Sequence, residues 1–100
     1  MSKKAIFVRL SAKPGMEREL EAFLQSALPL AENEAQTKTW YAVKFDAVTF
    51  GIFDSFDDEA GRDAHLNGVI ASELMAAAPN LLSSSPQIEL VDVLAAKIPA

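Results

Sequence analysis

The chain opens with apolar residues that alternate with a period of two. Residues 3–12 place Ile6, Val8 and Leu10 on one face and Ala5, Phe7 and Arg9 on the other. This alternation predicts a β-strand. From Met16 the spacing becomes helical, with an apolar stripe made of Met16, Leu20, Phe23, Leu24, Ala27 and Leu28. We expect Pro29 to kink or end that helix.

The middle of the chain predicts a pair of strands. Residues 37–56 contain two apolar runs with a turn near Asp46–Ala47. Bulky side chains fall on both faces of these runs, whereas a sheet with one wet face would alternate more cleanly. Both faces of this pair are therefore expected to be covered.

The last third of the chain predicts a broken helix and a closing strand. Residues 55–67 form a short helix that Ser55 or Asp57 caps and that stops at an Asn-Gly pair. Residues 68–82 form a second, nearly all-apolar helical piece, expected to be buried. Residues 86–98 then read as a long strand.

The predicted order is β-α-β-β-α-β, the α+β ferredoxin-like pattern of a four-stranded antiparallel sheet with its helices on one face. Such a sheet leaves its other face bare. A second copy of the sheet would cover that face and explain the two-sided apolar strands. We therefore expect a homodimer through the open sheet face, a dimeric α/β barrel.

Composition supports this picture. Residues 1–100 make a single domain, and 50% of them are apolar, which is rich for a lone domain of this size. The net charge is −5 without a basic cluster beyond Lys3–Lys4, so neither a nucleic acid nor a membrane is an expected partner. No cysteine, signal-peptide pattern or membrane-length apolar window is present, which predicts a cytoplasmic protein.

Most catalytic signatures are missing. The chain has no Gly-rich phosphate loop, nucleophile elbow, HExxH motif or EF-hand spacing. With one histidine and no cysteine, a transition-metal site would need several converging carboxylates, which no spacing suggests. The acidic run at residues 54–59 fits a helix N-terminus better than a calcium loop.

The single histidine, His65, is the leading candidate for a site residue. On a helical wheel, Ala60, Gly61 and Ala64 form the face expected to meet the sheet, and His65 lies on its border. The imidazole is then a candidate base or donor. The alternative is a half-exposed His65 that bonds a backbone carbonyl.

Asp54 is the second candidate. It shares a strand face with Ile52 and Phe50, so its carboxylate points to an apolar side, where it can orient a histidine or act as a base itself. Alternatively, Asp54 ends the strand and caps the helix.

Three further side chains carry two interpretations each. Arg62 is either a surface ion-pair partner of Asp58 or Glu59 or a group that balances an anion. Trp40 is either a core or interface residue or the wall of a ligand cavity. Arg9, mid-strand, is expected to need an acid that is buried or comes from another subunit.

Four segments of the sequence resemble the antibiotic biosynthesis monooxygenase superfamily, and the resemblance covers essentially the whole chain. They are KAIFVRLSAKPGMERELEAFL, TWYAVKFD, FGIFDSFDDEAGRDAHLNG and IELVDVLAAKI. The most specific piece is a strand-end aromatic followed by Ala-His-Leu, here Phe56 and residues 64–66. The pattern FDxFxDEAGRxAHLxG is similar in particular to a quinol-monooxygenase-like branch.

This resemblance implies a dimeric barrel whose pocket lies between the helices and the sheet. Known members oxidise phenols or quinols with molecular oxygen, without flavin or metal, so no cofactor is expected. Some relatives degrade haem, but this chain lacks their Asn, Trp and His set and has Ile70 where a second histidine often follows. Many relatives carry a tryptophan at the position of Phe56, so the role of that indole does not carry over.

The resulting hypothesis is a cofactor-independent monooxygenase that oxidises a small quinol or phenolic aromatic. It assigns His65 as base or donor, Asp54 as its orienter and Arg62 as the group that balances an anion; the cavity walls are Trp40, Phe50 and Phe56. Many superfamily members have no demonstrated activity, so enzymatic function stays open. The competing interpretation is a non-catalytic dimeric module that binds a small aromatic ligand.

Overall fold

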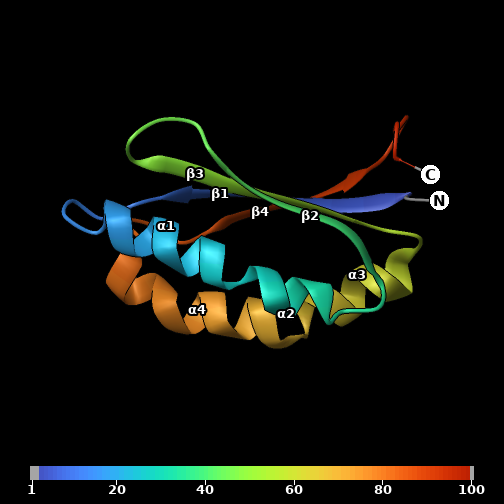
Figure 1. The fold of residues 1–100 in the computed structure, drawn as a ribbon, viewed down its shortest axis with the longest axis horizontal. Coiled ribbons are helices and arrows are strands. Elements are labelled where there is room, and N and C mark those ends of the chain that lie inside the picture. Colours follow the sequence, from blue (N-terminus) through green and yellow to red (C-terminus); the bar gives the residue numbers. More distant parts are fainter. Residues whose placement is uncertain (1–2, 100) are drawn as a thin grey trace.

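The computed structural model describes residues 3–99. The elements are β1 (Lys4–Ser11), α1 (Glu17–Ser26), α2 (Leu28–Glu32), β2 (Thr37–Lys44), β3 (Thr49–Phe56), α3 (Glu59–Leu66), α4 (Val69–Leu81) and β4 (Gln87–Asp92). The strands form one antiparallel sheet in the order β2-β3-β1-β4, and the helices lie on one of its faces (Figure 1). This is the ferredoxin-like α+β fold that the sequence predicts.

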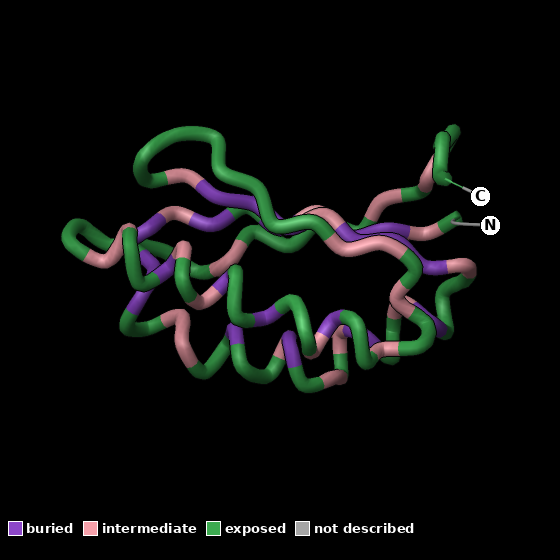
Figure 2. The backbone as a smooth tube through the Cα atoms, in the orientation of Figure 1, coloured by how far each residue is buried: buried purple, intermediate pink, exposed green. Residues whose placement is uncertain are grey.

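The register of the central strands decides which side chains meet the helices. Val8 lies opposite Ile52, and Ile6 lies opposite Asp54. Because side chains alternate along a strand, Asp54 shares the inner face with Phe50, Ile52 and Phe56. Most of the buried residues of the sheet lie on β1 and β3 (Figure 2). Asp54 is thus a carboxylate in a row of core side chains.

Two local predictions are confirmed by the chain's path. Pro29 lies in the first turn of α2, so the predicted break separates α1 from α2. Asp46 makes the turn between β2 and β3, where its Oδ1 accepts hydrogen bonds from the amides of Val48 and Thr49, 3.0 and 2.8 Å away. These bonds favour the ionised carboxylate and hold the pKa of Asp46 below its usual value.

The expected cap of α3 is wrong by one residue. Neither Ser55 nor Asp57 is the N-cap; Asp58 has that position, and its Oδ1 accepts a hydrogen bond of 2.8 Å from the amide of Gly61. Ser55 still belongs to β3, because its strand pairing continues to Phe56. The acidic run does begin a helix, as expected.

The inward face of α3 also differs from the helical wheel. Gly61 and His65 are buried, whereas Ala60 and Ala64 are exposed. Gly61 and His65 are one turn apart, so they point the same way. His65 therefore lies fully inside rather than on the border of the packed face.

The closing strand is shorter than predicted. β4 ends at Asp92, opposite Lys4, and the Val93 amide donates one further hydrogen bond of 2.9 Å to the Lys3 carbonyl. Residues 93–99 then leave the sheet on the side away from the helices (Figure 1).

The last helix is less buried than its composition suggests. α4 buries only a stripe that includes Ile70, Leu74 and Leu81, while Val69 is 57% and Met75 55% exposed. None of the helices between residues 3 and 99 is long and apolar enough to cross a membrane.

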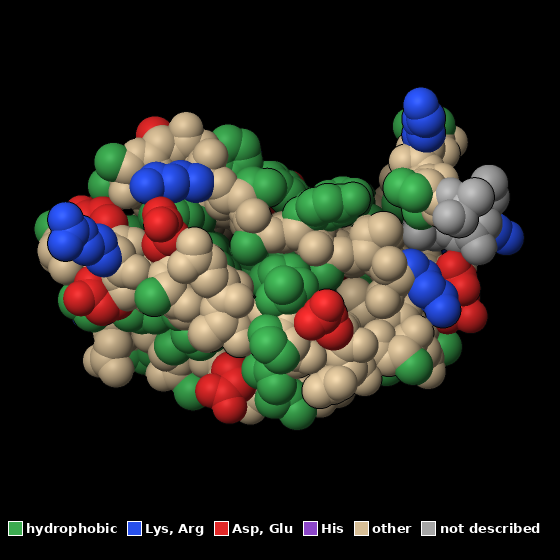
Figure 3. Space-filling view, viewed as in Figure 1, with side chains coloured by type: hydrophobic (Ala, Val, Ile, Leu, Met, Phe, Trp, Pro, Cys, Tyr) green, Lys and Arg blue, Asp and Glu red, His purple; other side chains and the backbone are tan. Residues whose placement is uncertain are grey.

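The open face of the sheet carries exposed aromatic side chains. Tyr41 is 57% and Phe45 51% exposed. Figure 3 shows hydrophobic side chains along the edge of this open face, between the β2–β3 turn and the C-terminal segment. The Arg9 guanidinium lies over the rings of Phe7 and Phe45, 5.4 and 4.7 Å from their centroids, in cation–π geometry. An acid from another subunit as a partner for Arg9 stays a prediction.

Candidate functional site

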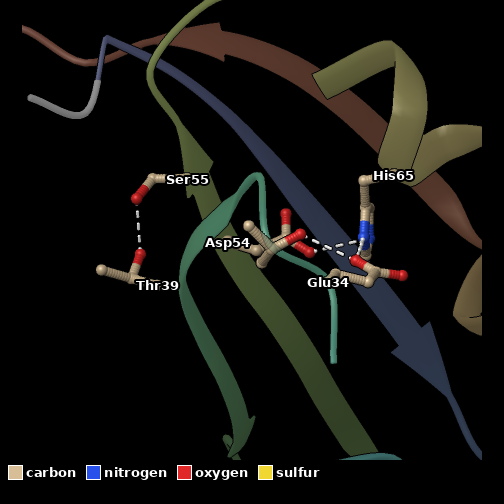
Figure 4. A network of polar contacts seen from close by, with 6 residues as sticks. Glu34, Thr39, Asp54, Ser55 and His65 are labelled. Carbon is tan, nitrogen blue, oxygen red and sulfur yellow. Dashed lines mark hydrogen bonds and ion pairs between the residues drawn. The ribbon is translucent and has the colours of Figure 1, made fainter. Parts of the chain in front are cut away.

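His65 lies between two carboxylates that come from different elements (Figure 4). Its Nδ1 is 2.5 Å from Oε1 of Glu34, in the segment between α2 and β2, and its Nε2 is 3.0 Å from Oδ2 of Asp54 on β3. Exposure rises along this chain: 1% for the side chain of Asp54, 8% for His65 and 20% for Glu34. The three side chains therefore connect the core to the surface.

This arrangement favours the charged form of the histidine. A carboxylate oxygen at each ring nitrogen requires both nitrogens to donate, which is the imidazolium form. Burial alone lowers the pKa of His65, but the hydrogen bonds and negative charges of Asp54 and Glu34 outweigh it and raise the pKa from 6.5 to about 9. At neutral pH the site is thus a cation held between two anions.

Neighbouring side chains hold this group in place. The Thr37 hydroxyl donates a hydrogen bond of 2.7 Å to Oε1 of Glu34, the oxygen that also faces His65. The Phe56 ring is fully buried, and its centroid lies 5.3 Å from that of the imidazole. Because the ring is packed on one side and bonded at both nitrogens, its orientation is fixed.

An outer cleft of about 440 Å³ opens on the Glu34 side of the imidazole. Its walls are Leu30, Asn33, Glu34, Ala35, Gln36, Thr37, Gly61, Ala64, His65, Gly68 and Val69. The lining is mostly apolar with a few polar groups, and its size is that of a site for a small organic ligand.

A much smaller inner cavity lies on the Asp54 side, between the sheet and α4. Its volume is about 40 Å³, and Trp40, Asp54 and His65 are among its walls. This is the space of about one water molecule. Within the described residues, Nε1 of Trp40 and Oδ1 of Asp54 are buried without a hydrogen-bond partner. The imidazole therefore separates a roomy outer cleft from a small inner cavity.

The structure brings together four of the six residues singled out in the sequence. Asp54 contacts His65 directly, Trp40 shares the inner cavity with both, and Phe56 packs beside the imidazole. Phe50 does not join them, because it lies four residues from Asp54 along β3 and lines a separate pocket with Leu24 of α1.

Arg62 also lies apart from the site. Its Nη1 donates hydrogen bonds to the carbonyl oxygens of Ala5 and Val91, 3.4 and 3.2 Å away. The expected surface pair with Asp58 or Glu59 is not among the ion pairs of the described residues, and the Asp58 carboxylate caps α3 instead. Arg62 is not among the walls of the outer cleft.

Glu34 is the residue that sequence reasoning missed. It belongs to an irregular stretch after α2 that reads as the ragged exit of a helix, and it reaches His65 across 31 positions of sequence. No periodicity marks it, because it lies in neither a helix nor a strand. Only the folded chain reveals it.

The two carboxylates do not form a metal site with His65. They face opposite nitrogens of the ring, so their oxygens do not converge on a common point. Across residues 3–99, no group of three or more His, Asp or Glu side chains is placed to hold a metal ion.

No family model matches the sequence, and no curated protein matches it. Among solved structures, the NE2512 protein of unknown function from Nitrosomonas europaea is 63% identical, with a TM-score of 0.98 over 100% of this chain and 97% of that one. The chain belongs to the family of that protein. The similarity to that protein covers the whole of this chain.

More distant structures share the fold. One, described as a "putative antibiotic biosynthesis monooxygenase" from Nitrosomonas europaea, is 10% identical, with a TM-score of 0.82 over 92% of this chain and 99% of that one. Another with the same description, from Deinococcus radiodurans, is 15% identical, with a TM-score of 0.79 over 97% and 98% of the two chains. At such identities the likeness concerns the fold alone, and the chain has a monooxygenase-like fold in that sense.

Proposed function

We propose that the chain is a cofactor-independent monooxygenase that oxidises a small quinol or phenol with molecular oxygen in the outer cleft. The observation that carries the proposal is the histidine clamped between two carboxylates at the wall of an apolar cleft. A phenol must lose its hydroxyl proton before it gives an electron to oxygen readily. The cleft offers a fixed acceptor for that proton.

The proton acceptor in this proposal is Glu34 rather than His65. Both ring nitrogens of His65 are engaged, so the imidazole has no free lone pair for a substrate hydroxyl. Glu34 lines the cleft and is the most exposed member of the group. Asp54 then positions the imidazolium, and His65 positions Glu34.

The proposed reaction balances without a cofactor. Glu34 takes the hydroxyl proton, and the phenolate passes an electron to oxygen. A carbon–oxygen bond then forms at the ring, and the peroxide regains the proton from Glu34. The ring hydroperoxide then loses water: the hydrogen comes from the ring C–H bond and the hydroxyl from the broken O–O bond. A new carbonyl oxygen remains on the ring. The quinol supplies all the electrons, one oxygen atom enters the ring, and the other leaves as water.

We expect Glu34→Gln to lower oxygen uptake with an active quinol by about a hundredfold, the usual size of a lost general base. The amide keeps the shape of the carboxylate but cannot hold the proton. The measurement is oxygen consumption with a panel of quinols and polyphenols. Asn33→Ala is the matched control, because Asn33 lines the same cleft, whereas the hydrogen bond to His65 comes from Glu34.

Two results would contradict this assignment. A Glu34→Gln variant with the parent rate would remove Glu34 from the mechanism. No uptake with any quinol, while simple aromatics still raise the melting temperature, would favour the non-catalytic ligand-binding module instead. The apolar cleft supports that second candidate equally, because binding an aromatic ligand needs no proton transfer.

We further propose that the chain acts as a homodimer through the open sheet face. The exposed side chains of Tyr41 and Val43 on β2 and of Phe45 just after it support this, since a row of large apolar groups is costly to leave in water. The fold also matches that of a family whose members are usually dimeric.

We expect light scattering at micromolar concentration to give the mass of a dimer. The double variant Tyr41→Glu and Phe45→Glu should give a monomer, because a buried interface does not tolerate unpaired charges. Val69→Glu, on the helical layer at the same exposure as Tyr41, is the control and should stay dimeric. A monomeric parent protein would refute the proposal.

A further inference from the structure

The open face of the sheet presents one positive and one negative side chain at the outward positions of its strands. Because side chains alternate along a strand, the face away from Asp54 carries Arg9 on β1 and Glu89 on β4. The other outward positions in the three strand ladders are uncharged. Lys38 lies at the irregular step of β2 and pairs with Asp57. This face is therefore an apolar surface with a single charge of each sign.

Neither charge has a partner within the described part of its own chain. Arg9 lies opposite Gln87, and Glu89 lies opposite Phe7, so the two charges are diagonal neighbours on adjacent strands. Both side chains are exposed. None of the ion pairs and side-chain hydrogen bonds among residues 3–99 includes either of them. Each charge is thus open to a partner from another chain.

Aromatic rings hold the Arg9 guanidinium against the sheet. Gly51 lies opposite Arg9 on β3, and Phe45 covers it, since a β-carbon there would meet Cε2 of Phe45 at 3.1 Å. The guanidinium lies over the rings of Phe45 and Phe7. Its N–H donors have no acceptor among the described residues. The group is therefore held in place while its donors remain available for a carboxylate.

The proposed homodimer takes both charges out of water, because it covers this face of the sheet. A buried charge is tolerated when an opposite charge and hydrogen bonds accompany it. The strands of a facing subunit offer the same two charged side chains. Arg9 against Arg9, or Glu89 against Glu89, would be repulsive. Arg9 against Glu89 is the pairing that remains.

Two-fold symmetry satisfies both charges at once. In a symmetric dimer the same surface faces itself, so a contact of Arg9 with Glu89 of the partner subunit occurs twice. Because the two side chains are diagonal neighbours, a two-fold axis that lies between the sheets and passes midway between them places each charge opposite its counterpart. The open face is therefore complementary in charge to a second copy of itself.

We propose that two ion pairs, each between Arg9 of one subunit and Glu89 of the partner subunit, fix how the two sheets face each other. This inference rests on the proposed homodimer, since it names the residues that orient it. The planar guanidinium donates two parallel hydrogen bonds to a carboxylate, which fixes orientation as well as adding affinity. The aromatic side chains supply the apolar area, and the ion pairs select one orientation among those that this area allows.

The test uses charge-reversed variants that cannot pair with themselves. Arg9→Glu leaves only negative charges on the open face, and Glu89→Arg leaves only positive ones. We expect each variant alone to dimerise at least about a hundredfold more weakly than the parent, because both pairs become repulsive. An equimolar mixture of the two variants should form a heterodimer about as tightly as the parent forms its dimer, since every pair is again opposite in sign. Analytical ultracentrifugation gives the dissociation constants, and native mass spectrometry with one variant isotopically labelled gives the share of heterodimer.

Arg18→Glu on α1 and Glu73→Arg on α4 are the matched controls. They make the same changes in net charge at exposed positions of the helical layer. Each should dimerise like the parent, and their mixture should contain the heterodimer in the statistical proportion. An equal enrichment of heterodimer in the control mixture would show that net charge alone drives it, and would overturn the proposal.

The double variant Arg9→Glu and Glu89→Arg separates a pair between subunits from a pair within one chain. It should restore dimerisation under either arrangement, but only a pair between subunits lets the two single variants rescue each other in the mixture. Rescue by the double variant without rescue in the mixture would overturn the proposal. A monomeric parent would refute the homodimer itself, whereas a dimeric parent whose single variants dimerise equally tightly would refute this inference alone.

Discussion

The free energy of unfolding is expected to fall by about 3 kcal/mol as the pH rises from below 6.5 to above 9, because the pKa of His65 is raised from 6.5 to about 9 in the folded chain. Above pH 6.5 the unfolded chain loses the imidazole proton, whereas the folded chain keeps it between Asp54 and Glu34. Folding therefore takes up a proton in this window. The stabilisation from His65 is complete below the pKa that it has in the unfolded chain. It is lost as the pH rises through the pKa that it has in the folded chain.

The measurement is urea unfolding at a fixed protein concentration, at pH values below, within and above this window. The chain has one histidine, so an NMR titration of its ring protons reports this group alone. We expect a midpoint near pH 9 for the folded protein. A midpoint near 6.5 would mean that the two carboxylates do not hold the imidazolium.

His65→Leu is expected to destabilise the fold by about 3–5 kcal/mol at neutral pH, the usual cost of removing one partner of a buried ion pair. Asp54 is 1% exposed, and its Oδ2 loses its contact with Nε2 of His65. Its Oδ1 is already buried without a partner among the described residues. The variant thus leaves an uncompensated charge in the core.

The second substitution Asp54→Asn identifies the cause. In the His65→Leu background it removes the charge and should restore about 1–3 kcal/mol, the cost assigned to an unsatisfied buried group. A double variant as unstable as His65→Leu alone would show that packing, and not charge, causes the loss.

The candidate site was only partly visible in the sequence. Asp54 stands out because it interrupts an apolar strand face, and His65 because it is a single imidazole at helical spacing from Gly61. Neither pattern indicates what else they contact. Glu34 lies in an irregular segment, so its approach to His65 depends on how α2 and α3 pack and not on any local period.

That third contact changes the chemistry expected from the first two. With Asp54 alone, His65 would keep one nitrogen free and could act as a base. With Glu34 on the other nitrogen, the imidazole becomes a structural cation and the base role passes to the carboxylate. Arg62 shows the same limit. Its helical spacing from Asp58 predicts an ion pair, but its guanidinium donates to backbone carbonyls of β1 and β4 instead.

By itself the sequence determined the order of elements, the break at Pro29, the turn at Asp46 and the placement of Asp54 among core side chains. These follow from alternation, helical spacing and turn chemistry, which act over a few neighbouring residues. Only the tertiary structure decided the cap at Asp58, the end of β4, the burial of His65 and its contact with Glu34. Those features depend on contacts between distant segments, and a hydrogen bond or a buried charge is defined by its partner in space.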